Sequence, residues 1–133
     1  MTATAVSKPK VLVVDDSATV RFALFSLLNE RFDVHVAMDG ETGIEMAQEI
    51  QPQLILLDVV MPDLSGLVVC RALREDARTV VTPIIMVTSQ DDEWEVEAGY
   101  AAGCTDYVVK PVDKTELLMK MDSWLFALTG AGA

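Results

Sequence analysis

Residues 54–66, LILLDVVMPDLSG, decide the fold of this chain. The stretch opens with four consecutive apolar residues, places a carboxylate directly after them at Asp58, and continues into turn residues between Pro62 and Gly66. A short apolar run bounded by turn residues is typical of a strand buried on both faces, which occurs in parallel sheets. The stretch therefore predicts a parallel strand with a carboxylate at its carboxyl end.

The same alternation of strand and helix extends outward in both directions from this stretch. Further short apolar or β-branched runs predict strands at 11–14, 34–37, 84–87 and 107–109. Between and after the strands, helices are predicted over about 17–30, 41–50, 65–76, 91–102 and 113–128. Five strand–helix units in series favour an α/β domain: a doubly wound, five-stranded parallel sheet with helices on both faces.

Apolar spacing predicts which helix faces are buried. For the helix over 17–30, which Asp16 or Ser17 can cap, the inward face is Val20, Ala23, Leu24, Leu27 and Leu28. For the helix over 113–128, which Asp113 and Glu116 can start, it is Leu117, Met121, Trp124 and Leu128. The helix over 91–102 offers two alternative faces, Trp94 with Ala98 and Ala101, or Val96 with Tyr100. Because Gly99 inside it costs about 1 kcal/mol relative to Ala, we expect this helix to be mobile.

Composition indicates one domain. The chain has 133 residues, of which 51% are hydrophobic, and a formal net charge of −11. We expect a domain over 9–128 between tails at 1–8 and 129–133. So acidic a chain is ill suited to bind nucleic acid directly, and no apolar run approaches the roughly 20 residues of a membrane span.

The start of the chain is polar and lacks the apolar segment of a signal peptide, which favours a cytoplasmic location. Cys70 and Cys104 are far apart in the sequence, and His35 does not complete a metal site with them. We expect the two cysteines to be buried free thiols in a reducing compartment.

Chemically reactive side chains follow four of the five predicted strands. The strands end in Asp15-Asp16, in Asp58, in Thr88-Ser89 and in Lys110-Pro111. Each has an ordinary structural explanation when taken singly, since Asp is a favoured helix cap and Lys is mostly exposed. In a parallel sheet, however, the carboxyl ends of the strands meet at one edge, where ligands bind.

Three carboxylates beside one ammonium leave a formal charge of about −2, which is costly when partly buried. A hard divalent cation such as Mg²⁺ would cancel that charge through oxygen ligands. With Mg²⁺, a hydroxyl and a Lys nearby, a carboxylate can act as the nucleophile for a phosphoryl group. The pattern therefore indicates phosphoryl chemistry.

The chain resembles the receiver domains of bacterial two-component response regulators, including those of chemotaxis. The matching segments are VLVVDDSATVR (11–21), LILLDVVMPDLSG (54–66), PIIMVTSQ (83–90) and DYVVKP (106–111), and the resemblance covers about residues 9–127. It implies the flavodoxin-like strand order 2-1-3-4-5.

The resemblance also implies a role for each site residue. Asp58 would accept a phosphoryl group from a phosphohistidine on a sensor histidine kinase or a histidine phosphotransfer protein. Mg²⁺ would be held by Asp15, Asp16, Asp58 and the backbone carbonyl of Val60.

Two further positions would bind the phosphoryl oxygens: Thr88 by moving towards them, and Lys110 by pairing with them. The Lys110–Pro111 peptide would be cis, and Tyr107 would occupy the aromatic switch position. The domain would then be an autocatalytic switch and not an enzyme with turnover, shifting the surface of its fourth helix, fifth strand and fifth helix.

Exposed apolar residues on two helices suggest partner surfaces. Phe22 and Phe25 point away from the inward face of the helix over 17–30, and we expect them to bind the phosphodonor. Met119 and Phe126 fall on the outward face of the helix over 113–128, and we expect them to bind an output protein of unknown identity.

The lifetime of the phosphorylated state is expected to be long. In the family, the residues two positions after the acceptor and two after the Thr flank the phosphoryl group; here these are Val60 and Gln90. Val60 cannot hydrogen-bond a water through its side chain, and Gln90 cannot accept the proton of one.

Two other classes of protein share parts of this pattern. A haloacid-dehalogenase-like phosphatase also uses an Asp nucleophile, but within a D-x-D motif after the first strand, where this chain has adjacent Asp15 and Asp16. A flavin-binding flavodoxin would need a phosphate cradle at that position, and an acidic pair repels phosphate. A receiver belonging to a longer regulator is a third possibility, although the short tail after Leu128 favours a stand-alone receiver.

Overall fold

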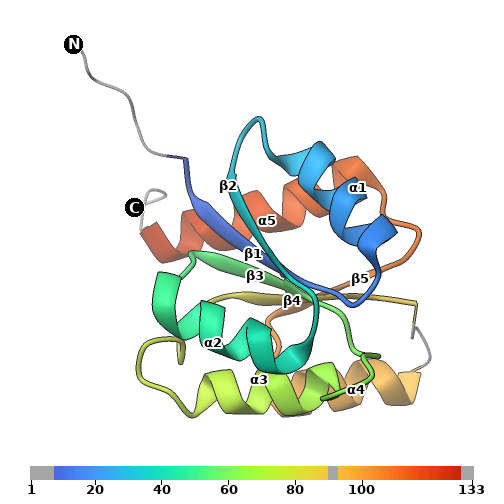
Figure 1. The fold of residues 1–133 in the computed structure, drawn as a ribbon. Helices are drawn as coiled ribbons and strands as arrows, with labels where there is room; N and C mark the ends of the chain where they lie inside the picture. Colours follow the sequence, from blue (N-terminus) through green and yellow to red (C-terminus); the bar gives the residue numbers. More distant parts are fainter. Residues whose placement is uncertain (1–7, 90–92, 130–133) are drawn as a thin grey trace.

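The computed structural model describes residues 8–89 and 93–129, and it contains one five-stranded sheet (Figure 1). The strands are Lys10–Val14 (β1), Asp33–Ala37 (β2), Leu54–Leu57 (β3), Ile84–Thr88 (β4) and Asp106–Val109 (β5). The helices are Ala18–Leu28 (α1), Gly40–Ile50 (α2), Gly66–Arg74 (α3), Glu93–Ala102 (α4) and Lys114–Thr129 (α5). Every strand pair is parallel and the spatial order is β2-β1-β3-β4-β5, which confirms the predicted fold.

The central strands are buried on both faces because helices cover both sides of the sheet. In Figure 1, α1 and α5 lie on one side, and α2, α3 and α4 lie on the other. Side chains alternate between two cores: in β3, Ile55 and Leu57 pack towards α2–α4, whereas Leu54 and Leu56 pack towards α1 and α5. This explains the near-continuous apolar runs in the sequence.

The helix ends are set by local hydrogen bonds. Ser17, and not Asp16, is the N-cap of α1, since its hydroxyl accepts from the amide of Val20 at 3.3 Å. The helix ends at Leu28, earlier than predicted, because the carbonyl of Leu28 accepts from Arg31 and from the buried Phe32 and so closes a turn. The carboxylate of Asp113 accepts from the amide of Glu116 at 2.8 Å, as expected for the start of α5.

Two predicted helix faces need correction. On α1, Leu24 and Leu28 are buried as predicted, but Ala23 is exposed because it borders an apolar groove. On α4, the buried positions are Gly99 and Ala102, with Val96 packed against the core. Of the two predicted faces, Val96 does pack against the core, but Tyr100 and Ala101 are exposed and neither face included Gly99. The side chain of Trp94 lies outside the described residues.

The remaining core predictions largely hold. On α5, Leu117 and Met121 are fully buried and Trp124 packs against them, whereas the side chain of Leu128 lies outside the described residues. Cys70 and Cys104 are both free and buried, and burial raises their pKa values to about 11 and about 12. Among the described residues, no helix combines the length and the apolar character needed to cross a membrane.

Candidate functional site

The first carboxylate of the site, Asp15, directly follows β1 and is almost fully buried. Its Oδ1 accepts from the amide of Ser17 at 2.9 Å, and its Oδ2 accepts from Nζ of Lys110 at 2.9 Å. The guanidinium of Arg21 on α1 donates to the backbone carbonyl of Asp15 at 2.8 Å. The side chain and the backbone of Asp15 are therefore both fixed.

The second carboxylate, Asp58, follows β3 and is only 6% exposed. Its amide donates to the carbonyl of Val14 at 3.0 Å, so the strand pairing continues one residue into the site. Gly66 at the start of α3 packs directly on the Asp58 backbone, where any Cβ would collide with the Asp58 carbonyl oxygen. Glycine at this position lets α3 begin in direct contact with the Asp58 backbone.

Asp16 completes a group of three acids. One carboxylate oxygen each of Asp15, Asp16 and Asp58 lies within 4.8 Å of the other two, although Asp16 itself is exposed. Carboxylate oxygens grouped in this way are the ligands that Mg²⁺ prefers, and the exposed side leaves room for water or phosphate oxygens. The residues present therefore fit a divalent cation.

A hydroxyl and an ammonium reach the same place from β4 and from the segment after β5. Thr88 is the fully buried last residue of β4, and the amide of Lys110 donates to its carbonyl at 2.9 Å. Nζ of Lys110 lies 3.6 Å from Oδ2 of Asp58 as well as 2.9 Å from Asp15. The Lys110–Pro111 peptide is cis, as the resemblance implied.

The electrostatics of the site work against an ionised Asp58. Burial raises the pKa of its carboxyl above the ordinary 3.8, and the charge of Asp15 raises it further. Lys110, a hydrogen bond from the Thr88 hydroxyl and one from the Val60 amide act in the opposite direction without cancelling the rise. A cation bound among the carboxylates would relieve this repulsion.

The other predicted site residues have diverse positions. The Val60 side chain is 55% exposed at the mouth of the site, and Gln90 lies outside the described residues. Tyr107 is buried in the core beneath α4. The four residues predicted to form partner surfaces are exposed: Phe22, Phe25, Met119 and Phe126.

Sequence reasoning missed two residues that make hydrogen bonds around the site. Asp63, in the loop after β3, accepts from the amides of Gly40 and Glu41 at the start of α2. Arg21 reaches back to Asp15 from the first turn of α1. The contact of Arg21 could have been predicted, because Arg21 follows Asp15 by only six residues in the same strand–helix unit. The contacts of Asp63 could not, because its partners are more than 20 residues away in the sequence.

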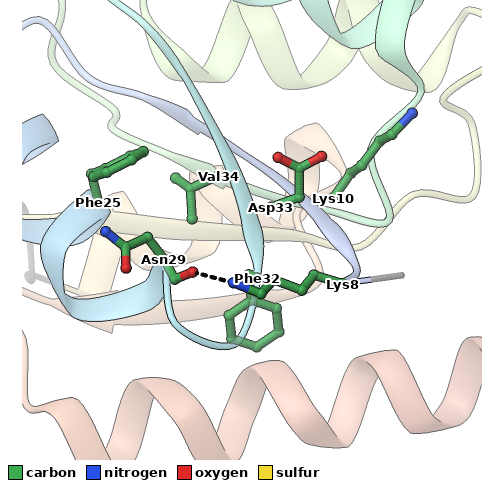
Figure 2. A pocket seen from close by; sticks show the side chains of 7 residues that line it. All are labelled: Lys8, Lys10, Phe25, Asn29, Phe32, Asp33 and Val34. Atoms are coloured by element: carbon green, nitrogen blue, oxygen red, sulfur yellow. Dashed lines mark hydrogen bonds between the residues drawn. The ribbon is translucent and has the colours of Figure 1, made fainter. Parts of the chain in front are cut away.

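A groove beside the site and a separate pocket both border α1. A groove of about 290 Å³ lies beside the site, lined by α1 residues that include Val20, Ala23 and Leu27, and by Pro111 and Val112. Figure 2 shows a pocket of about 500 Å³ near the opposite end of β1 and β2. Its lining includes Lys8, Phe32 and Phe25, which is predicted to contact the phosphodonor. It includes none of the acids of the site, nor Thr88 or Lys110, so it is a feature separate from the acidic site.

Comparison with known proteins places these features in a family. A family model described as the response regulator receiver domain matches residues 11–122. Protein PilH of Pseudomonas aeruginosa is 37% identical over 117 residues, which cover 87% of this chain and 97% of PilH. Response regulator ArlR of Staphylococcus saprophyticus is 38% identical over 117 residues, and the chain spans about half of its length (52%).

A solved structure shows the same fold with a metal ion. The receiver domain of sensor histidine kinase PA1611 from Pseudomonas aeruginosa superposes with a TM-score of 0.84 at 25% identity. The match covers 90% of this chain and 98% of that one, whose active-site cleft coordinates a magnesium ion.

Proposed function

The chain belongs to the response regulator receiver domain family, and on this premise we propose that Asp58 is the residue at which it accepts a phosphoryl group. The observation that carries the proposal is the setting of Asp58. It is the carboxylate that lies among two other acids and within reach of both the Thr88 hydroxyl and the Lys110 ammonium. Among the contacts described above, neither Asp15 nor Asp16 has both Thr88 and Lys110 as neighbours.

The proposed step is a direct transfer. An oxygen of the Asp58 carboxylate attacks the phosphorus of a phosphohistidine, the new P–O bond forms, and the P–N bond breaks with its electron pair remaining on the imidazole. Lys110 and Thr88 supply a positive charge and a hydrogen-bond donor for the phosphoryl oxygens. Mg²⁺, held by Asp15, Asp16, Asp58 and the Val60 carbonyl, would neutralise charge on those oxygens when bound.

Phosphorylation would act as a switch through charge. Aspartyl phosphate adds roughly one negative charge and three acceptor oxygens to a site already crowded with acids. Thr88 would move to bond these oxygens, and Tyr107 would repack beneath α4, which alters the surface formed by α4, β5 and α5. Hydrolysis later returns the carboxylate and inorganic phosphate, so we propose a switch without substrate turnover. The proposed location of this switch is the cytoplasm.

The phosphodonor is proposed to dock on α1. A sensor histidine kinase or histidine phosphotransfer protein must bring its phosphohistidine to Asp58, and α1 begins beside the site. Phe22 is 73% exposed on this helix and Phe25 is exposed as well. Two large apolar side chains open to solvent on one helix are typical of a protein-binding surface. The apolar groove along Val20 and Ala23 lies next to Lys110 and would extend the same surface.

The output partner is proposed to bind α5. Met119 and Phe126 are exposed large apolar side chains on that helix, which packs against β5 through Asp106 and Trp124. Exposed Met and Phe suit an adaptable protein surface.

Labelling with acetyl phosphate and Mg²⁺ tests the acceptor. We expect the native chain to gain one acid-labile phosphoryl group and the Asp58→Asn variant to gain none, as read by intact mass. Asp16→Asn, which keeps the nucleophile and removes one proposed metal ligand, should label slowly at limiting Mg²⁺. Equal labelling of Asp58→Asn would refute the assignment.

The donor surface needs a different measurement. We expect Phe22→Ser to slow transfer from the cognate phosphohistidine protein at sub-saturating concentration and to leave labelling by acetyl phosphate unchanged. Phe126→Ser provides the matched control, since it removes another exposed phenyl ring from a different helix. Unchanged transfer to Phe22→Ser would remove the basis for a donor surface on this face.

A further inference from the structure

We propose that Asp63 is a positioning residue: its carboxylate fastens the loop after Asp58 to the start of α2 and thereby sets the Val60 backbone for metal binding. This inference rests on the proposed function, because it assigns the support of the same site. The side chain of Asp63 touches neither Asp58 nor the other two acids in the described contacts. Its effect would therefore be exerted through the loop.

The contact that Asp63 makes is directional and uses both carboxylate oxygens. Oδ1 accepts from the amide of Gly40 at 3.0 Å, and Oδ2 accepts from the amide of Glu41 at 2.9 Å. These amides belong to the first turn of α2, where helix N–H groups have no partners within the helix and where a negative charge is favoured. The same two bonds hold the pKa of the Asp63 carboxyl below its ordinary value.

The start of α2 already has a cap of its own. Asp39 is its N-cap residue and accepts from the amide of Thr42 at 2.8 Å. Asp63, from a different part of the chain, accepts from the two amides that precede Thr42, those of Gly40 and Glu41. Its contact therefore joins the loop after β3 to α2. Leu64, the next residue after Asp63, also packs against the start of α2: a Cβ added to Gly40 would lie 2.9 Å from the Cβ of Leu64.

The loop that Asp63 fastens carries the residue next to the phosphoryl group. Val59 and Met61 anchor the loop by side-chain burial, and the amide of Gly66 donates to the Val59 carbonyl at 2.7 Å. Val60 between them is exposed, so its own side chain does not fix the peptide that donates to Asp58 and would offer a carbonyl to the metal. Asp63 is the nearest polar anchor after it, and residues that orient a metal ligand commonly change metal affinity about tenfold or more when removed.

Mn²⁺ binding, followed by electron paramagnetic resonance, tests the proposal without any phosphoryl transfer. We expect Asp63→Ala to bind Mn²⁺ roughly tenfold more weakly than the native chain, with Asp63→Asn in between because it keeps one acceptor oxygen. Amide exchange at Val60 in the metal-free protein should be faster in Asp63→Ala than in the native chain.

Asp39→Ala is the matched control. It removes a carboxylate and a helix cap from the same end of α2, with the same change in net charge, but among the described contacts its side chain bonds Thr42 and not the acceptor loop. Both alanine variants should lower the urea midpoint, whereas Asp39→Ala should keep the native Mn²⁺ affinity within about twofold.

Each outcome decides the matter. The positioning role is overturned if Asp63→Ala binds Mn²⁺ with native affinity, or if Asp39→Ala loses as much Mn²⁺ affinity as Asp63→Ala does. If Asp63→Ala does not fold, Asp63→Asn is judged by the same criteria. Failure of the native chain to label at Asp58 would overturn the proposed function instead. In that case unchanged exchange at Val60 in Asp63→Ala would still overturn the anchoring of the loop.

Discussion

Asp58 combines two demands that oppose each other. As the proposed nucleophile it must be ionised, yet burial and the neighbouring Asp15 both favour its protonated form. In the metal-free protein the ionised carboxylate therefore reduces the free energy of unfolding, and a bound cation restores it. Function at this position is obtained at the expense of stability, as is common for reactive residues.

Replacing Asp58 by Asn should therefore stabilise the metal-free protein at pH 7, by roughly 1 kcal/mol after allowance for solvent screening at the open side. The native carboxyl has a pKa above that of the unfolded chain, so the folded state binds its proton more tightly. The contribution of this group to the free energy of unfolding therefore falls as pH rises from 3.8 through the raised pKa. Urea denaturation in EDTA measures the difference.

The advantage of Asp58→Asn should disappear below pH 3.8, where the carboxyl is protonated in both states. A variant no more stable than the native chain at pH 7 would contradict the assignment of repulsion to Asp58. Added Mg²⁺ should raise the urea midpoint of the native chain more than that of the variant.

Val60 and Gln90 are the residues expected to govern a second property at the same scale, the lifetime of the phosphorylated state. An attacking water must be held in line with the phosphorus, and a Val side chain can neither orient that water nor accept its proton. We expect the Val60→Asn, Gln90→Glu double variant to lose label at least several times faster than the native chain, in the absence of any phosphatase. Equal decay rates would show that these positions do not control hydrolysis.

Among the elements, α4 has the least ordinary packing. From Glu95 onward, where its side chains are described, the buried face consists of Gly99 and Ala102 with Val96, so few apolar groups of this part hold it to the sheet. A Cβ built on Gly99 would lie 3.4 Å from Sγ of Cys104 and 3.4 Å from Cε2 of Tyr107, which is ordinary contact. The glycine therefore leaves the helix close to the proposed switch residue without being required by strain.

Gly99→Ala should accordingly raise the free energy of unfolding by up to about 1 kcal/mol, because alanine restores helix propensity and its methyl group fits the space. We expect amide exchange in native α4 to be faster than in α5 and to slow in the variant. Ala98→Gly, on the same helix, should have the opposite effect. Exchange slower in native α4 than in α5 would contradict the mobility expected for this helix.

Across the whole molecule, Arg74 joins parts of the chain that lie far apart in the sequence. From the end of α3, its guanidinium donates to the carbonyls of Thr82 at 2.7 Å and Gly103 at 2.8 Å, and to the hydroxyl of Thr105 at 3.2 Å. Gly103 adopts φ +110°, which brings its backbone against the Arg74 side chain. The guanidinium thus supports the two loops that precede β4 and β5 at the edge opposite the site.

Arg74→Ala should lower the free energy of unfolding by about 3 kcal/mol, because it removes the guanidinium donor from the carbonyls of Thr82 and Gly103. Arg71→Ala is the control, since Arg71 is an exposed residue of the same helix and should change stability by less than about 0.5 kcal/mol. Urea denaturation of both variants checks this, and equal effects would mean that the bonds of Arg74 contribute little.

The sequence by itself determined the alternation of strands and helices and the group of residues at the strand ends. Apolar runs such as Leu54–Leu57 are local signals of buried parallel strands, and such strands necessarily bring Asp15, Asp58, Thr88 and Lys110 to one edge. The carboxylates could be predicted to lie together because topology places them, without knowledge of any side-chain contact.

Only the tertiary structure decided which residues of different elements contact one another around that site. The bonds from Gly40 and Glu41 to Asp63, and the closeness of Gly66 to the Asp58 carbonyl, join residues from different elements. The inward face of α4 was also misjudged, because a glycine gives no periodic hydrophobic signal and is buried only through what packs against it. Periodicity reports the face that a segment prefers, whereas distances between segments depend on how the whole chain packs.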